Sequence, residues 1–334
     1  MQLRIDELEL PLVHAFATAR DAKTISRTAV FRLAHDGFEG LGETSPIARY
    51  GENVESVIAH FAERPPLGSD PFALEALLAG RPPAARCGLD IALHDLIGKL
   101  TGRPLYALFG LDPTLAPVTS FTLGLGESED VLARLEAVRD HPILKLKVGK
   151  GGEIELLEAI RSRYTGTLRL DANEAWTPAE AVAVLVELER FEIEFCEQPI
   201  RAGSPEGLRY IRERTHVPLV ADEDAKDARD LPALAGCVEG VNLKLVKCGG
   251  LRGALAAIHT ARALGFKIML GCMVESAILT TAAAHLSPLV DWADLDGPLL
   301  TAYDPFAGVT YDRGKPILPR EPGLGVRERS EVGA

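Results

Sequence analysis

From Val118 onward, short apolar runs alternate with longer segments whose apolar positions follow a helical repeat. The runs cover residues 118–123, 143–148, 168–173, 193–198, 218–223, 240–247, 267–272 and 292–296. Successive runs start 22 to 27 residues apart, which leaves room for one covering helix after each strand. An open doubly wound sheet would compete, but no glycine-rich turn follows the first run. We therefore expect an α/β fold, a (β/α)7β barrel of the TIM type.

The residues before this repeat mix strand and helix patterns. Residues 3–10 and 28–34 alternate as strands do, and helical patterns cover 53–63, 71–80 and 85–101. We expect residues 1–112 to form a smaller α+β capping domain and residues 113–305 to form the barrel. The Pro- and Gly-rich tail, about 306–334, is expected to fold back and complete the cap.

Composition narrows the class of protein. Hydrophobic residues make up 47% of the chain and charged residues 25%, as in soluble globular proteins. The net charge is −12 with no long Lys/Arg cluster, which argues against nucleic acid, and no apolar stretch is long enough to span a membrane. Five scattered cysteines and an N-terminus unlike a signal peptide indicate a cytoplasmic protein with reduced thiols. These exclusions leave a small molecule as the expected partner, and they leave the formation of a homo-oligomer open.

Acidic residues stand at the ends of three successive expected strands. Asp171, Glu197 and Asp222 are 26 and 25 residues apart, which is one repeat each. In such barrels the carboxyl ends of the strands meet at the active-site face. Three carboxylates in a partly dry site would repel one another unless a cation lay among them. Oxygen ligands of this kind favour Mg²⁺.

Lysines flank these acids. Lys145 and Lys147 alternate with apolar residues, so both should point into the barrel mouth, and Lys244 lies on a strand across the barrel. Lys247 has the opposite parity, and we expect it at the surface. Two lysines that face each other across a carboxylate substrate suggest removal of a proton on one face and its return on the other.

The segments KLK, DAN, EQP, ADE, NLKLVKCGG and GCMVES, in this order, resemble the muconate-lactonising branch of the enolase superfamily. The resemblance implies that Asp171, Glu197 and Asp222 bind Mg²⁺ and that Lys147 and Lys244 are the acid/base pair of a 1,1-proton transfer through an enediolate. It also implies that Lys145 assists the substrate carboxylate and that Glu223 and Asn173 support the ligands. The segment KIMLGC has no histidine, which disfavours the mandelate-racemase branch, and no histidine receives a catalytic role.

The expected strand eight narrows the substrate class. Asp294 and Asp296 in WADLDGP resemble the paired aspartates with which dipeptide epimerases hold the substrate α-ammonium. Arg20 matches a cap-loop arginine that Ala–Glu epimerases direct to the glutamate side chain of the substrate. Glu275 instead leaves room for a substrate with a basic side chain. The leading hypothesis is epimerisation of L-Ala-D/L-Glu or a similar dipeptide, and by resemblance a part in peptidoglycan recycling. The alternatives are an o-succinylbenzoate synthase, an N-succinylamino acid racemase or a muconate cycloisomerase-type lyase.

Overall fold

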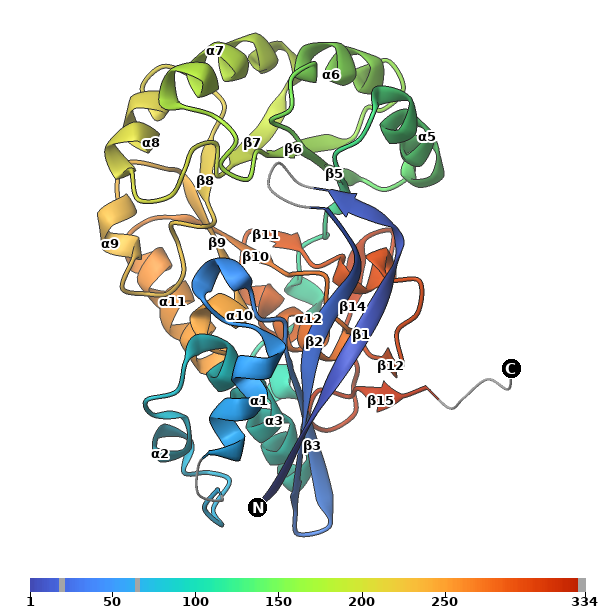
Figure 1. The fold of residues 1–334 in the computed structure, drawn as a ribbon, viewed down its shortest axis with the longest axis vertical. Coiled ribbons are helices and arrows are strands. Elements are labelled where there is room, and N and C mark those ends of the chain that lie inside the picture. Colours follow the sequence, from blue (N-terminus) through green and yellow to red (C-terminus); the bar gives the residue numbers. More distant parts are fainter. Residues whose placement is uncertain (18–21, 64–66, 330–334) are drawn as a thin grey trace.

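The computed structural model describes residues 1–17, 22–63 and 67–329. The N-terminal part begins with a three-stranded antiparallel sheet in the order β1-β2-β3, with β2 in the middle. The strands are β1 (Gln2–Ala17), β2 (Ala22–His35) and β3 (Phe38–Thr44). In Figure 1 this sheet lies below the barrel, and its first two strands extend toward the barrel mouth.

The helices of the cap are η1 (Ala48–Tyr50), α1 (Val54–Ala62), α2 (Leu74–Leu78), α3 (Pro83–Thr101) and α4 (Leu105–Leu108). Of these, α1 and α3 pack on the cap sheet. Helix α3 packs directly on β3, where a Cβ on Gly42 would come within 2.1 Å of the Gly88 carbonyl oxygen. A Cβ on Gly40 would meet the Ala92 carbonyl oxygen at 2.2 Å, so both positions need glycine for this close approach.

Eight parallel strands form the second sheet, in the order in which they occur along the chain. They are β4 (Phe121–Leu123), β5 (Ile143–Lys147), β6 (Thr167–Asp171), β7 (Ile193–Glu197), β8 (Leu219–Ala221), β9 (Gly240–Lys244), β10 (Lys267–Gly271) and β11 (Trp292–Asp294). A parallel bridge between Thr119 and Ala293 joins the start of the sheet to its end. The expected (β/α)7β barrel with an α+β cap is therefore confirmed.

Helices follow the barrel strands, and most of them form an arc outside the barrel (Figure 1). They are α5 (Ser128–Val138), α6 (Glu153–Arg161), α7 (Pro178–Leu188), η3 (Glu189–Phe191), α8 (Pro205–Arg212), α9 (Leu231–Leu234), α10 (Leu245–Cys248), α11 (Leu251–Ala263), α12 (Ala277–Leu286) and η4 (Ser287–Leu289). Local sequence fixes their starts. At α7, for example, Thr177 and Glu180 exchange side-chain hydrogen bonds with each other's backbone N–H groups, and Pro178 needs no donor in the first turn.

The inside of the barrel is closed below the mouth by large side chains. Phe195, Val220 and Met269 pack together there without contact with solvent. Arg169 is also buried; its Nε donates to Glu194 at 2.7 Å and its Nη1 to the Ala293 carbonyl at 2.9 Å. The barrel therefore has a packed floor beneath the carboxyl ends of its strands.

After β11 the chain passes through η5 (Gly297–Leu300), β12 (Phe306–Ala307), β13 (Thr310–Asp312), β14 (Lys315–Ile317) and β15 (Arg327–Glu328). This tail contacts the cap: Leu105 N donates to the Gly323 carbonyl at 3.0 Å, and Arg32 forms an ion pair with Glu328. None of the helices in the described ranges has the length and apolar character needed to cross a membrane.

Candidate active site

A cavity of about 460 Å³ lies at the carboxyl ends of the barrel strands, beneath the cap. Its barrel residues are Thr122, Lys145, Lys147, Asn173, Asp222, Glu223, Lys244, Cys272, Met273, Val274, Asp294 and Asp296, followed by Leu300. Its cap residues are Lys23 and residues 45–50. Strand register explains the convergence, because Lys147 pairs with Asp171 and Asp171 with Glu197 in one row. Lys244 and Asp294 both pair with Gly271 in a second row.

Lys147 and Lys244 approach this cavity from opposite sides. Their strands, β5 and β9, are four places apart in an eight-stranded barrel. Lys147 Nζ donates to Asp171 Oδ2 at 2.6 Å and to Asn173 Oδ1 at 2.9 Å. Lys244 Nζ donates to Asp222 Oδ2 at 2.9 Å. Burial disfavours the charge of Lys244, but the neighbouring Asp222 carboxylate raises the pKa of Lys244 above its ordinary value.

Lys145 lies among carboxylates at the centre of the site. Its Nζ is 2.6 Å from Glu197 Oε2, 2.7 Å from Asp294 Oδ2 and 3.1 Å from Asp171 Oδ2. Burial opposes the charge, yet these three carboxylates raise the pKa of Lys145 well above its usual value. The Lys145 ammonium therefore links β6 and β7 to β11 by ion pairs.

The strand-end carboxylates Asp171, Glu197 and Asp222 are all buried. Burial would raise the pKa of Asp171, but Lys147 and Lys145 hold it well below its usual range, and Lys244 and Lys247 do the same for Asp222. Glu197 behaves differently. Burial, together with the charge of Asp171, raises the pKa of Glu197 to about 7. Burial is the larger of these two causes, and a cation bound beside Glu197 would favour its charged form.

These carboxylates suit a hard divalent cation. In residues 1–17, 22–63 and 67–329, no group of three His, Cys, Asp or Glu side chains is arranged so that it could hold a metal ion, and lysine ammoniums lie against these carboxylates. However, the donors are carboxylate oxygens from three adjacent strands. Buried Glu197 Oε2 accepts no hydrogen bond, and the charge that it faces is the Lys145 ammonium at 2.6 Å. The residues present therefore fit Mg²⁺.

Asp294 and Asp296 lie together at the end of β11. Ser120 Oγ donates to Asp294 Oδ1 at 2.7 Å, and Thr122 N donates to Asp296 Oδ2 at 2.6 Å. Burial would raise the pKa of Asp294, but Lys145 lowers it. Burial and the charge of Asp294 raise the pKa of Asp296 to about 6. Both are ionised at neutral pH and can attract a cationic group.

The cap loop is tied to the barrel by an ion pair. Arg49 Nη2 lies 2.5 Å from Glu174 Oε1, and that oxygen also accepts from Ala202 N at 2.8 Å. The Glu174 side chain is 5% exposed, and the residue lies three positions beyond the end of β6. Because Arg49 belongs to η1, the pair holds the wall that η1 contributes to the cavity.

We expect Arg49→Met to raise KM about fivefold with little change in kcat, because a half-buried ion pair of this kind contributes about 1 kcal/mol to holding the loop closed. Steady-state kinetics would measure it. The matched control is Arg190→Met, since Arg190 pairs with Glu158 at 2.7 Å on the outside of the barrel. An unchanged KM in Arg49→Met would contradict this role.

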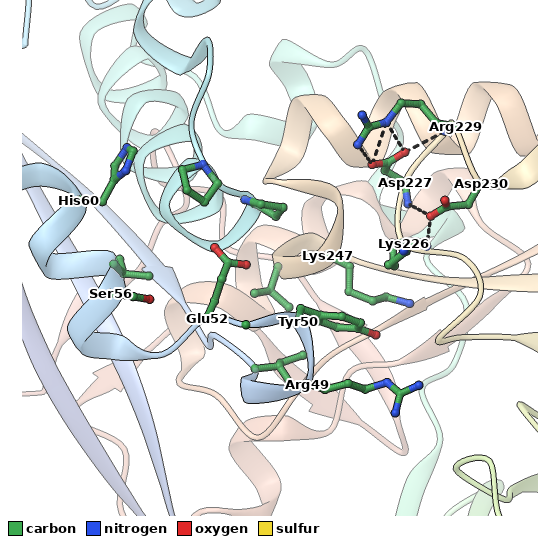
Figure 2. Close-up of a pocket in the computed structure, with 16 residues that line it drawn as sticks. Arg49, Tyr50, Glu52, Ser56, His60, Lys226, Asp227, Arg229, Asp230 and Lys247 are labelled. Atoms are coloured by element: carbon green, nitrogen blue, oxygen red, sulfur yellow. Dashed lines mark hydrogen bonds and ion pairs between the residues drawn. The ribbon is translucent and has the colours of Figure 1, made fainter. Parts of the chain in front are cut away.

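Residues Ile47, Arg49 and Tyr50 also line a second cavity, of about 660 Å³, on the other side of η1. Figure 2 shows the side chains around it: Glu52, Ser56 and His60 from the cap, Lys226, Asp227, Arg229 and Asp230 from the loop after β8, and Lys247. Asp227 forms an ion pair with Arg229, and Asp230 accepts a hydrogen bond from the backbone N–H of Lys226, so both carboxylates are bound within the loop.

Other expected site residues lie as follows. Glu223 lines the active-site cavity, but Glu275 is not among the residues that line it. The Glu275 carboxylate instead accepts hydrogen bonds from Met273 N and Thr280 Oγ1, both at 3.0 Å. Arg20 lies outside the described residues. Lys247 was expected at the surface, and this was wrong: it is 4% exposed. Strand β9 ends at Lys244 and a turn of α10 follows, so strand parity no longer applies to Lys247.

Sequence reasoning missed Asn242, whose Nδ2 donates to Glu197 Oε1 at 2.7 Å. A signal was available, because Asn242 is two residues before Lys244 on one strand and therefore points to the same side. Ser120 and Thr122 were also missed. Small hydroxyl residues at the start of the barrel carry no comparable signal in the sequence.

Two family models match nearly the whole chain. The mandelate racemase / muconate lactonizing enzyme N-terminal domain matches residues 3–110, and the enolase C-terminal domain-like model matches residues 128–332. A protein named L-Ala-D/L-Glu epimerase, from Bacteroides thetaiotaomicron, is 37% identical over 98% of this chain and 88% of its own length.

Solved structures agree with these matches. A substrate-liganded complex of the L-Ala-D/L-Glu epimerase from Bacillus subtilis has a TM-score of 0.92 at 29% identity and covers 98% of each chain. A dipeptide epimerase from Cytophaga hutchinsonii, in complex with Mg and the dipeptide D-Ala-L-Val, has a TM-score of 0.91 at 27% identity, covering 99% of this chain and 96% of that one.

Proposed function

Because the chain belongs to the mandelate racemase / muconate lactonizing enzyme family of the enolase superfamily and is an isomerase, we propose that it epimerises a dipeptide. The inverted centre is the α-carbon of the C-terminal residue, in L-Ala-D/L-Glu or a similar dipeptide. Relatives with epimerase names and Mg-bound dipeptide complexes support this proposal. The rest of the support comes from the residues themselves.

The observation that carries the proposal is the placement of Lys147 and Lys244 on opposite sides of one cavity. A planar enediolate has two faces, and inversion needs a proton acceptor on one and a donor on the other. One lysine, as the neutral amine, takes the α-proton while the other, as an ammonium, returns a proton to the opposite face. A cation held at Asp222 would oppose the effect by which that carboxylate raises the pKa of Lys244. Asn173 accepts from Lys147 Nζ at 2.9 Å and so fixes its direction.

Asp294 and Asp296 account for a free amino terminus. Two buried carboxylates at the same end of the cavity would be costly without a cationic partner. Lys145 partly balances Asp294. Asp296 accepts a hydrogen bond from the Thr122 N–H and lies 3.8 Å from the Cys272 thiol, and neither of these groups carries a positive charge. A dipeptide ammonium supplies the missing positive charge.

Asp171, Glu197 and Asp222 would hold Mg²⁺. When bound, Mg²⁺ would balance these carboxylates, bind the substrate carboxylate and stabilise the negative charge that develops on it. Lys145 lies within 3.1 Å of Asp171 and Glu197, so it is placed to assist the same substrate carboxylate. The carboxylates and the lysine that partly balances their charge therefore lie in one buried cluster.

The test is incubation of the enzyme with a dipeptide library in D₂O, followed by ¹H NMR of the α-proton at the C-terminal residue. We expect exchange and the appearance of the second epimer for L-Ala-D-Glu or a related dipeptide. The library should include acidic, basic and apolar C-terminal residues. If no dipeptide exchanges its α-proton, the proposal is wrong.

A further inference from the structure

We propose that Lys247 is a positioning residue that fixes Asp222, and through Asn242 also Glu197, in the orientation needed to bind the divalent cation. This inference rests on the proposed function, because it concerns the cation of that site. Lys247 belongs to α10, on the cavity wall that Figure 2 shows next to Tyr50. Nothing in the proton transfer itself uses it.

The environment of Lys247 is saturated with acceptors. Its Nζ lies 2.5 Å from Asp222 Oδ1, 2.6 Å from the Asp222 carbonyl, and 3.0 Å from each of the carbonyls of Ala225 and Asn242. An ammonium has three N–H donors, so four oxygens leave it no donor for a substrate. The side chain is fully buried. Lys247 is therefore anchored in place and cannot act as a mobile acid or base.

The contacts of Lys247 extend the barrel where strand pairing stops. The last register pair of β8 and β9 is Ala221 with Val241. Lys247 Nζ then joins the carbonyls of the next residues on each strand, Asp222 and Asn242. The Lys247 ammonium thus joins the ends of β8 and β9, as backbone hydrogen bonds join the residues before them.

Each of the two residues that Lys247 joins carries or contacts a strand-end carboxylate. Lys247 takes Oδ1 of Asp222 and leaves Oδ2 to Lys244 and the cavity. Asn242, whose carbonyl Lys247 binds, donates from its side chain to Glu197 Oε1. The two lysines on this segment therefore have different roles, since Lys244 faces the reaction and Lys247 holds the ligands.

A purely electrostatic role would have the opposite consequence. If Lys247 acted only through its charge, removing that charge would make the site more negative and strengthen cation binding. If it acts by positioning, its removal leaves Asp222 and two strand ends unrestrained and weakens binding. Residues that orient metal ligands in this way typically contribute about 10- to 100-fold to metal affinity.

The experiment is isothermal titration calorimetry of EDTA-treated protein with MgCl₂ alone, with folding checked by circular dichroism. We expect Lys247→Met to bind Mg²⁺ at least about tenfold more weakly than the wild type. Lys247→Gln keeps two N–H donors without the charge, so its affinity for Mg²⁺ should fall between those of the wild type and Lys247→Met. If the methionine variant does not fold, the glutamine variant decides the question. Cys248→Ala, on the same short helix, is the control for local packing and should bind Mg²⁺ as the wild type does.

Equal or tighter Mg²⁺ binding by a folded Lys247 variant would overturn the positioning role while leaving the proposed function intact. Weak binding by Cys248→Ala as well would also overturn it, because local packing would then explain the loss. A wild-type protein that binds no Mg²⁺ would refute the metal part of the proposed function and this inference with it.

Discussion

Replacement of Lys147 with methionine is expected to lower the rate of epimerisation by about 10³-fold or more, because a positioned acid/base group typically contributes 10²- to 10⁴-fold. The same holds for Lys244→Met. Methionine keeps most of the length of the side chain, so the cavity walls should be preserved. The loss should appear in kcat, since neither variant removes Asp294 or Asp296.

Each lysine variant should still exchange the α-proton of one epimer. Lys147 and Lys244 lie on opposite sides of the cavity, so the lysine that remains can reach only the proton on its own face. ¹H NMR in D₂O, started separately from each epimer, measures this, and the two variants should show opposite preferences.

The control for the lysine variants is Lys150→Met. Lys150 is exposed in the loop after β5 and should be replaceable without effect. Interconversion of the epimers at a near-normal rate by Lys147→Met or by Lys244→Met would contradict the two-base assignment.

Asp296→Asn should raise KM for a dipeptide by about two orders of magnitude. A buried charge pair that loses one partner typically costs about 2–5 kcal/mol, and the asparagine keeps the shape while losing the charge. Substrates without a free ammonium, such as those of the synthase and cycloisomerase alternatives, should be turned over almost normally. Asp312→Asn, on exposed strand β13, is the matched control.

The wild type should show a matching pH dependence of KM. Since the pKa of Asp296 is raised to about 6, the carboxylate is ionised above this pH and becomes protonated as the pH falls through it. The ammonium then loses its partner, so KM for a dipeptide should increase below pH 6. Asp296→Asn should lack this increase. An equal increase in both proteins would assign the titration to another group.

The barrel could be predicted from the sequence because its repeating unit is local. Each strand and its covering helix lie within one repeat, and alternation along a strand fixes which side chains face the mouth. This reasoning brought Lys145, Lys147, Asp171 and Glu197 to one place, and register confirms the row that joins Lys147 to Asp171 and Glu197. Asn242 could have been found by the same rule.

Strand parity stops applying where a strand ends. Lys247 lies three residues beyond the end of β9, and one helical turn returns it to the buried side. Glu275 lies in the segment between β10 and α12, where no repeat determines direction, and its carboxylate turns to Thr280. A sequence pattern describes regular elements and carries little information about the turns that leave them.

Contacts between the cap and the barrel depend on tertiary structure alone. Arg49 and Glu174 are 125 residues apart, and nothing in either segment marks the other as its partner. The sequence by itself determined the barrel, the order of its strands and the carboxylates and lysines at their ends, because periodicity encodes these. Only the folded chain decided which ammonium pairs with which carboxylate, how Lys247 restrains Asp222, and how η1 closes the cavity. These depend on distances between elements that no local pattern records.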